Sequence, residues 1–409
     1  MSVRRTAAVL AATAVIGAVV APAASAASPS PSTAIPSGLY GKTDPTYDGV
    51  WRQSLALLAQ DTVGVRPAEK AVDWLTGQQC ANGAFAAYRA DASAACDAKT
   101  QVDTNSTAAA VQALAALGGH DDATRKAVTW LKSVQNKDGG WGYMAGGADD
   151  TNSTSVVIGA LKAVGEKPET VTKGGKSPYD ALVELSTPCD GEGGGAFAYQ
   201  PDKKGKLAAN ADATAAGVTA GVGQGFVALA GTPLDLTGCV TTDTPNRADA
   251  TANGAGYLAD ELARTPYLKS ALPGAKDQPD YGNTADAVVA LSATGAKKAA
   301  QKPLAWLEKN SADWAAESGP AAYAQLIFAA HVTGTDPRDF GGQDLVAQLG
   351  ATGPAPIAAG ASATPSEKKK DEKKDDGNGP AVWWIIGVGL VAGIGIGFLI
   401  SGRNKKQQL

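Results

Sequence analysis

The side chains best suited to bind or transform a small molecule lie in two identical polar pentapeptides. The letters DTNST occupy positions 103–107 and again positions 150–154. Their carboxylate, hydroxyl and carboxamide groups donate and accept hydrogen bonds, so they suit a ligand rich in amides or hydroxyls. The alternative is helix capping, because Asp, Asn, Ser or Thr can each accept a bond from the unpaired N–H groups of a helix's first turn.

The pentapeptides are one part of a longer unit that the chain repeats. In the clearest copy, residues 126–165, an outward helix ends near Val134, a Gly-rich aromatic turn runs to Tyr143, and a second apolar helix starts at Ser155. The corresponding second helices of other copies are predicted at 107–117, 285–291 and 321–332. A period of about 50 residues with two helices indicates units that bury their apolar faces by stacking on neighbours.

The turn carries a spacing that resembles a known repeat. Gln135-x-x-x-Gly139-x-Trp141 follows an apolar helix, and a weaker copy runs from Gln79 to Phe85. This pattern resembles the repeat of the squalene-cyclase and prenyltransferase superfamily. The resemblance implies an all-α fold over residues 44–345, an α6/α6 toroid of six inner and six outer helices. Because a fold does not decide a function, the activity is judged from the residues.

The carboxylates, histidines and cysteines do not complete the catalytic motifs that this resemblance implies. Class II terpene cyclases use an Asp-x-Asp-Asp acid, and the best match here, Asp149-Asp150, lacks the first carboxylate. Protein prenyltransferases need a zinc site, but neither His120 nor His331 lies in a repeat turn. No Cys has a Gln at the spacing of the related thioester domains. The sequence therefore predicts no catalytic residue and no metal site, and favours binding over catalysis.

The polar corners also resemble the repeat corners of the cobalamin carriers, intrinsic factor and transcobalamin, which are helical toroids. Inner helices of a toroid start at one mouth, so the corners are expected to converge there above an apolar funnel. The resemblance implies a corrinoid or similar ligand site at this rim, walled by aromatic residues of the turns. Its residues would be Asp103, Thr104, Asn105, Trp141, Tyr143, Asp150, Thr151, Asn152, Tyr199, Tyr281 and Asn283. Packing between repeats is the alternative role for Trp141.

Both ends of the chain predict export and attachment to a membrane. Residues 1–26 combine a short basic segment, an apolar run and a small-residue cleavage site, as a secretory signal does. The remaining segments are a flexible lead (27–43), the toroid (44–345), a Pro/Ala/Gly- and Lys/Asp/Glu-rich stalk (346–380), an uncharged apolar run that can cross a bilayer (381–400) and a basic cytoplasmic tail (401–409). The bulk of the chain is then extracellular, and its net charge of -4 indicates no nucleic-acid partner.

Four cysteines lie in the part that is expected outside the cell. Their even number in an oxidising compartment predicts two disulfides, for which three pairings exist. Pairing of Cys80 with Cys96 and of Cys189 with Cys239 is favoured, because each pair brackets an insertion in the repeat.

Three functions follow from these observations. The first is a membrane-anchored extracellular protein that captures a corrinoid and passes it to an uptake system. In the carriers a second domain closes over the ligand, and here the stalk and anchor take its place, so we expect an exported lid protein and a membrane transporter as partners. The second is an exported enzyme that handles terpenes or prenyl compounds. The third is a structural or adhesive surface domain.

Overall fold

The computed structural model describes residues 35–270 and 277–358, and helices dominate this part of the chain. The longer helices are α1 (Gly49–Thr62), α2 (Glu69–Gly77), α3 (Thr104–Leu117), α4 (Asp121–Ser133), α5 (Thr151–Ala163), α7 (Ala211–Gly221), α8 (Arg247–Arg264), α9 (Tyr281–Ala293), α10 (Lys297–Asn310) and α12 (Pro320–Thr333). Shorter ones are η1 (Pro168–Thr170), α6 (Pro178–Glu184), α11 (Ala312–Ser318) and α13 (Leu345–Ala351). Strands β1 (Leu268–Lys269) and β2 (Pro279–Asp280) pair antiparallel.

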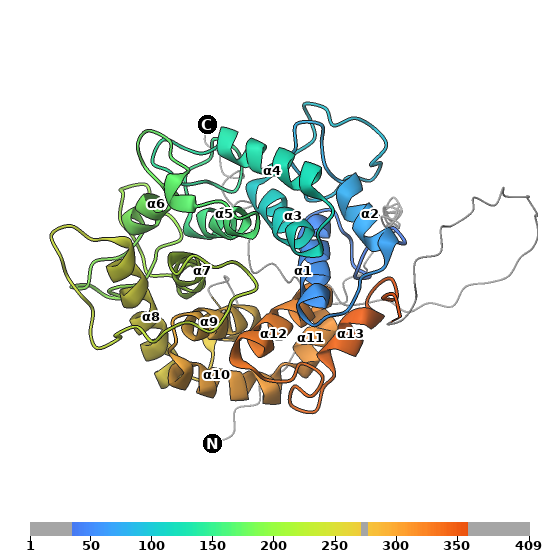
Figure 1. The fold of residues 1–409 in the computed structure, drawn as a ribbon. Coiled ribbons are helices and arrows are strands. Elements are labelled where there is room, and N and C mark those ends of the chain that lie inside the picture. The colour runs from blue at the N-terminus through green and yellow to red at the C-terminus, as the bar shows by residue number, and fades with distance from the viewer. Residues whose placement is uncertain (1–34, 271–276, 359–409) are drawn as a thin grey trace, which may run out of the picture. The chain divides into compact units, whose positions relative to one another are not determined.

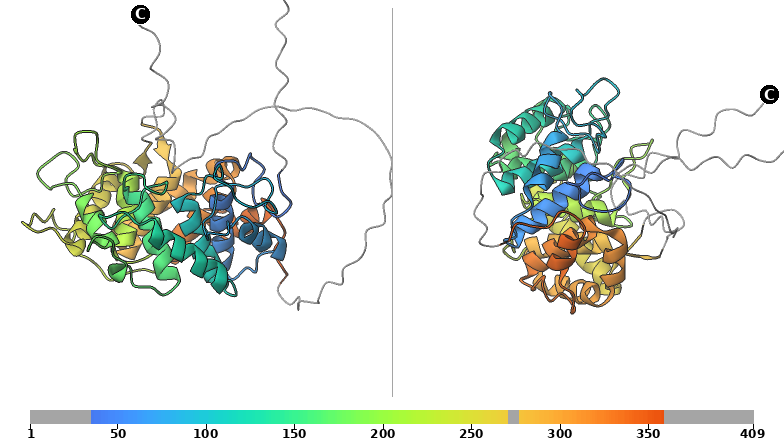
Figure 2. Two further views of the ribbon diagram at one scale, coloured as in Figure 1. Left: turned by 90° about the horizontal axis from the view of Figure 1, so that it is seen from above. Right: turned by 90° about the vertical axis from the view of Figure 1, so that its right-hand side faces the viewer.

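Six of these helices form a closed inner ring. In order, α1, α3, α5, α7, α9 and α12 each contact the next, and α12 contacts α1 again. Outside the ring, α2, α4, α6, α8, α10 and α13 each contact the inner helix that precedes or follows them in the chain, and α11 packs on α12 (Figure 1). Figure 2 shows the same helices from two further directions. The predicted all-α toroid is therefore confirmed for the described residues.

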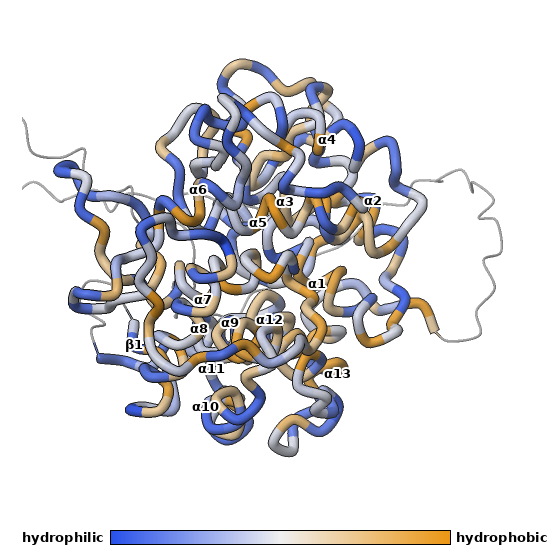
Figure 3. The backbone as a smooth tube through the Cα atoms, turned by 60° about the vertical axis from the view of Figure 1, so that its left-hand side comes forward, coloured by the Kyte–Doolittle hydropathy of each residue, from blue (hydrophilic) through white to orange (hydrophobic). Residues whose placement is uncertain are grey.

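The two rings differ in sequence because they face different surroundings. The inner helix α12 is apolar along most of its length, and ten of its residues are buried. The outer helices α4 and α10 mix charged and apolar residues along their length (Figure 3). Only some of their residues are buried, as for a helix that packs one face on its neighbours. A helix that is buried on all sides is apolar all round, whereas a helix that is buried on one side needs only one apolar face.

The recurring glutamine and glycine of the turn hold adjacent repeats together. Gln135 Nε2 donates to the carbonyl oxygens of Gly139 and Val171 at 2.8 and 3.0 Å. Gln79 Nε2 does the same in the previous copy. Gly139 has φ +91°, and a Cβ there would lie 2.3 Å from the Ser177 carbonyl oxygen at the start of α6. Only glycine fits so close an approach, so this spacing is structural.

The inner helices begin earlier than the apolar pattern predicts. The second helix of the clearest copy starts at Thr151 rather than Ser155, and the previous one at Thr104 rather than Thr107. The polar pentapeptide is thus the first turn of the helix rather than a loop before it. Its side chains are packed because neighbouring repeats cover that turn, and all ten residues of the two pentapeptides are buried.

Segments on both sides of the predicted toroid also pack onto it. Tyr40 is fully buried, and its hydroxyl donates to Gln60 and to the Pro354 carbonyl. Leu349 of α13 is buried as well. The packed region therefore extends beyond the predicted limits of 44 and 345, into the predicted lead and stalk.

The favoured disulfide pairing is confirmed. Cys80 bonds Cys96, and Cys189 bonds Cys239. Among the helices of residues 35–270 and 277–358, none is long and apolar enough to cross a membrane. The predicted signal (1–26), the transmembrane segment (381–400) and the basic tail (401–409) lie outside the described residues.

Candidate functional site

All six inner helices start at the same end of the ring, which we call the mouth. Tyr143 links the first two corners: its carbonyl accepts from Thr104 N, and its own N–H bonds the Asp150 carboxylate. Asn152 of α5 reaches Asp212 of α7. The predicted corners therefore converge at one mouth, as the sequence indicated.

The two identical corners are built chiefly to hold the helices. The Asp103 carboxylate accepts from Ser106 N, and the Asp150 carboxylate accepts from Ser153 N, each at 2.6 Å. The last residue of the pentapeptide has a second task, because Thr154 Oγ1 accepts from the Trp141 N–H at 3.1 Å. Capping thus accounts for both aspartates, which burial leaves with a pKa raised to about 6.

The threonines and tyrosines of the corners lie at the interface between repeats. Thr151 donates through Oγ1 to the Ala198 carbonyl at 2.6 Å, and its N–H bonds the Tyr199 carbonyl. Thr104 Oγ1 is buried and has no hydrogen-bond partner within the described residues. Tyr143 and Tyr199 are half-buried, and burial raises the pKa of both phenols. These tyrosines lie at the predicted rim, as neutral phenols.

Two predicted rim residues point elsewhere. Trp141 is 1% exposed, and its indole Nε1–H donates to the Leu131 carbonyl at 2.7 Å, so it is a core residue between repeats. Tyr281 stacks between Trp306 and Trp314 of the outer helices. Both were expected to wall the ligand site, and both face away because their large rings fill the space between inner and outer helices.

The carboxamides of the corners occupy the position that faces the ring interior. Asn105 and Asn152 each lie two residues after their capping aspartate, and they are 3% and 2% exposed. Asn152 Nδ2 donates to Asp212 Oδ2 at 2.8 Å. The carbonyl oxygens of both side chains, Asn105 Oδ1 and Asn152 Oδ1, have no hydrogen-bond partner in the described part of the chain.

Two carboxyl groups that sequence reasoning missed complete the mouth. Asp212 lies two residues after the cap Asn210 of α7, where the other copies have Asn105 and Asn152. Asp286 lies one turn deeper on α9, where Gln325 Nε2 of α12 donates to its Oδ2 at 3.0 Å. We call Asp212 and Asp286 the acid pair. Both side chains are half-buried.

Burial and mutual repulsion keep protons on the acid pair. Burial, followed by the nearby Asp280 and Asp150 charges, raises the pKa of Asp212 to about 7 against the opposing bond from Asn152. Burial and the charges of Asp212 and Asp280 raise the pKa of Asp286 to about 8. At neutral pH the pair therefore carries at least one proton that it can donate.

The segment after α7 packs between inner helices α1, α3, α5 and α12. Phe226 packs edge-on against Trp51 of α1 and stacks with Phe328 of α12, at ring-centroid distances of 5.4 and 6.4 Å. Its backbone N–H bonds Gln112 Oε1 of α3 at 3.0 Å. Phe328 lies one helical turn beyond Gln325, so an aromatic floor lies below the acid pair on the same face of α12.

Two cavities open at the mouth. One of about 370 Å³ lies between α7, α8 and the strand pair, and Asp212 and Asn283 line it. Asn283 also supports the cap of α9 through a bond from its Nδ2 to Asp280 Oδ2. The other cavity, of about 520 Å³, includes Asp103 and Tyr143.

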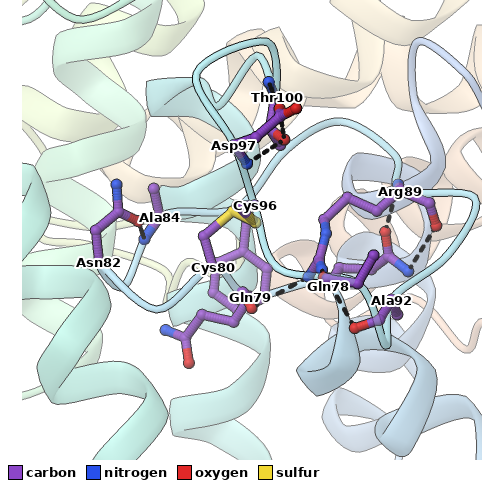
Figure 4. The surroundings of a disulfide bond; sticks show 12 residues. Gln78, Gln79, Cys80, Asn82, Ala84, Arg89, Ala92, Cys96, Asp97 and Thr100 are labelled. Carbon is purple, nitrogen blue, oxygen red and sulfur yellow. Dashed lines mark hydrogen bonds between the residues drawn. A yellow bond between two sulfur atoms is a disulfide. The ribbon is translucent and has the colours of Figure 1, made fainter.

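The wall of the larger cavity is a loop fastened by the Cys80–Cys96 disulfide. Arg89 donates from its guanidinium to the carbonyls of Gly77 and Gln79, and its N–H bonds Gln78 Oε1 (Figure 4). The guanidinium is therefore occupied by backbone acceptors of the loop. Its role is to shape this wall rather than to bind an anion.

The adjacent carboxylates Asp149 and Asp150 do not act as one acid. Asp150 is a helix cap, whereas Asn136 Nδ2 bonds Asp149 Oδ1 within the Gly-rich turn. Burial and the nearby Asp138 raise the pKa of Asp149 to about 7. Within residues 35–270 and 277–358, no group of three His, Cys, Asp or Glu side chains is placed to hold a metal ion.

The signal for the acid pair was present in the sequence. Asp212 stands where two other copies have an asparagine. Asp286 is the one carboxylate in the apolar stretch 284–293. A carboxylate in an otherwise buried helix is rare unless it is paired or functional.

Comparisons with known proteins agree with the toroid. Residues 51–205 match the family model of the prenyltransferase alpha-alpha toroid domain. Over 138 residues the chain is 31% identical to a squalene–hopene cyclase of Alicyclobacillus acidocaldarius, and this region spans 31% of the chain and 22% of that cyclase.

Two solved structures are also similar. An ent-copalyl diphosphate synthase from Streptomyces platensis is 16% identical with a TM-score of 0.47, covering 70% of this chain and 50% of that one. A protein from Actinoplanes is 17% identical with a TM-score of 0.45, covering 73% and 80%. None of these comparisons points to cobalamin.

Proposed function

Because the chain belongs to the squalene-cyclase and prenyltransferase toroid family, we propose that it is an exported protein that handles an isoprenoid by general-acid catalysis. The observation that carries this proposal is the acid pair. Asp212 and Asp286 lie on neighbouring inner helices, hold a proton near neutral pH, and are only half-buried. A general acid whose pKa is near the working pH is well matched to proton donation.

The surroundings of the acid pair suit the chemistry of a carbocation. A proton transferred from the pair to the substrate leaves positive charge on carbon. The aromatic floor of Trp51, Phe226 and Phe328 offers ring faces and edges to an apolar chain, and ring faces attract a cation.

Export and attachment to the membrane are part of the proposal. The two disulfides suit an oxidising compartment. The apolar run at 381–400 would hold the toroid at the surface of a membrane, close to where isoprenoids dissolve. A separate lid protein and a transporter are then not needed for the chemistry, since the substrate partitions from the bilayer.

The direct test is turnover by the whole chain. The purified protein in lipid nanodiscs is incubated with squalene, geranylgeraniol and geranylgeranyl diphosphate, and products are followed by mass spectrometry. We expect one of these compounds to be converted, and the Asp212→Asn/Asp286→Asn double variant to be inactive. Absence of both conversion and binding for all three would overturn the proposal.

Capture of a corrinoid is the second candidate. It is supported by the unpaired oxygens of Asn105 and Asn152, which could accept hydrogen bonds from a ligand's amide groups. It ranks lower here because the two aspartates, the threonines and Trp141 of the proposed rim already have structural partners. Co-elution of cobinamide with the protein, abolished in Asn105→Ala, would reverse this order.

A further inference from the structure

Exposed apolar side chains gather at one of the two cavities. Within the described residues, the large apolar side chains that stay exposed are Tyr47, Met144, Leu229 and Val240. Tyr47 is 83% exposed, Met144 is 38% exposed, and both line the cavity of about 520 Å³ at the mouth. Single exposed apolar residues are ordinary on a protein surface, but exposed ones that meet at a cavity indicate a binding site.

The wall of this cavity adds further aromatic and methyl surface. The rings of Tyr88 and Tyr143 line it, and Tyr88 stacks on Trp74 of α2 at a ring-centroid distance of 6.4 Å. The alanines of the lining are Ala87, Ala90, Ala94 and Ala95. The volume of the cavity lies in the range of about 300–1,000 Å³ that small-molecule sites occupy. The cavity therefore has room for a small molecule between apolar side chains.

The charged side chains of the lining are engaged within the loop that forms the wall. The Asp91 and Asp97 carboxylates accept hydrogen bonds from N–H and hydroxyl groups two or three residues later in the chain. The guanidinium of Arg89 is held by loop carbonyls. Lys99 brings a second positive charge, which with Arg89 balances these two carboxylates. A charged ligand would disturb these contacts, whereas an uncharged apolar ligand leaves them intact.

The cavity lies beside the side chains that lead along the mouth to the acid pair. Tyr143 and Asp103 both line it. Burial, and then the nearby Asp103 and Tyr199, raise the pKa of Tyr143. Burial, and then the charges of Asp150 and Asp212, raise the pKa of Tyr199. Each of these groups is thus close enough to feel the charge of the next, from the cavity to Asp212.

We propose that the 520 Å³ cavity binds the uncharged apolar chain of an isoprenoid against Tyr47, Tyr88, Tyr143 and Met144. This inference rests on the proposed function and deepens it, because it gives the carbon chain of the substrate a place apart from the acid pair. Contact with aromatic rings and a thioether needs no charge and no hydrogen bond on the ligand, so the site recognises the chain rather than the head group. No bond forms or breaks at this site.

The first experiment uses a chain that has no double bond to protonate. Phytanol, a fully saturated prenyl alcohol, is given a diazirine at its chain end and irradiated with the whole protein in nanodiscs. Mass spectrometry then identifies the labelled peptides. We expect labels in residues 46–47, 87–101 and 143–144, and we expect excess unlabelled phytanol to suppress them. Absence of labels from these segments, or labels there that unlabelled phytanol does not suppress, would overturn the inference.

The second experiment compares exposed apolar residues inside and outside the cavity. The Tyr47→Lys/Met144→Lys double variant puts charge where the chain should lie, so its affinity for phytanol should fall about tenfold or more. Leu229→Lys is the matched control, because Leu229 is 67% exposed and lines neither of the two cavities. Suppression of the label by increasing unlabelled phytanol gives the affinities, and thermal unfolding checks that each variant is folded. Met144→Lys alone replaces the double variant if that protein does not fold. Wild-type affinity in the cavity variant, or an equal loss in the control, would contradict the site.

The outcomes separate this inference from the proposed function. If a prenyl compound is converted through the acid pair while phytanol does not label the cavity, the function stands and the chain-binding inference fails. If phytanol labels the cavity but no prenyl compound is converted, the binding site stands and the catalytic proposal fails. Absence of both the label and any conversion would remove both.

Discussion

The two halves of the mouth are built from the same repeat but perform different tasks. On α3 and α5 the pentapeptide is identical, and its aspartates and final threonines are fully engaged in capping and in joining the repeats. On α7 and α9 the corner has diverged, and there the acid pair appears. The identical aspartates and final threonines of the first two corners hold the helices together. The residues that differ on α7 and α9 carry the candidate chemistry.

The third corner keeps two of these contacts. Asn210 still caps α7 by accepting from Ala213 N at 2.9 Å, and Thr214 Oγ1 still accepts from the Phe197 N–H at 2.9 Å. The other letters differ: the cap is Asn210 instead of Asp, Ala211 and Ala213 replace Thr and Ser, and Asp212 replaces the asparagine. The cap and the final threonine therefore keep their bonds, while the position two residues after the cap carries a carboxyl group.

The largest expected effect separates the two halves by activity. Asp286→Asn keeps the shape and the bond from Gln325 but removes the proton donor, so turnover should fall by about 10²–10⁴-fold, the usual contribution of a general acid. Asp150→Asn should leave turnover within about threefold, because Asn is also an effective cap. Product formation by mass spectrometry distinguishes them. Equal losses in both variants would break the comparison.

The second-largest effect is a loss of folding stability when a contact of the identical corners on α3 and α5 is removed. Thr154→Val deprives the buried Trp141 N–H of its acceptor, so the free energy of unfolding should drop by about 1–3 kcal/mol. Thr129→Val is the matched control, because Thr129 is exposed on α4, and its cost should stay within about 0.5 kcal/mol. Urea unfolding followed by circular dichroism measures both. A Thr154→Val protein as stable as wild type would remove the scaffold role.

The pH dependence of stability sharpens the comparison further. A carboxyl whose folded pKa exceeds its unfolded value favours folding fully below pH 3.8, and that contribution is lost as pH rises to the folded pKa. The caps Asp103 and Asp150 should lose theirs by about pH 6, and the acid pair between pH 4 and about 8. Stability should therefore fall from pH 4 to 8.

The variants assign this pH dependence to the acid pair. The Asp286→Asn protein should be more stable than wild type at pH 8, and its stability should decline less steeply above pH 6. The Asp212→Asn substitution should reduce this decline by a smaller amount. Urea unfolding at intervals between pH 4 and 8 provides the curves. An unchanged slope above pH 6 in Asp286→Asn would mean that this carboxyl titrates normally.

The smallest effect concerns capping alone. Asp150→Ala should cost about 1 kcal/mol in unfolding free energy, because Ala leaves the Ser153 N–H without its acceptor. Asp150→Asn should cost only a few tenths. If both variants lose the same stability, the carboxylate charge rather than the cap is what α5 requires.

The sequence predicted the toroid because the features that build it repeat. The Gln135-to-Trp141 spacing and its copy reflect a turn that must approach the next helix closely, as Gly139 does. Convergence of the corners at one mouth followed from the same symmetry. The disulfide pairs were predictable because each closes an insertion within one repeat.

The candidate site could be predicted only in part, because the period of a repeat does not show which way each side chain points. Trp141 and Tyr281 were expected at the rim, but their rings fill the gap between inner and outer helices. Asn105 and Asn152 lie in the first turns of α3 and α5, and their predicted contact with a ligand stays a prediction. Asp286 was missed because its pairing with Gln325 joins residues 39 positions apart on two different helices, which no local pattern reveals.

The protonation state of the acid pair tests the central claim most directly. Infrared spectra of the ligand-free protein between pH 5 and 9 are recorded for wild type, Asp286→Asn and Asp212→Asn. We expect a protonated-carboxyl C=O band in wild type at pH 7 that disappears near pH 8 and is weakened in each variant. A wild-type protein with no such band at pH 7, or one whose band is unchanged in both variants, would contradict the account.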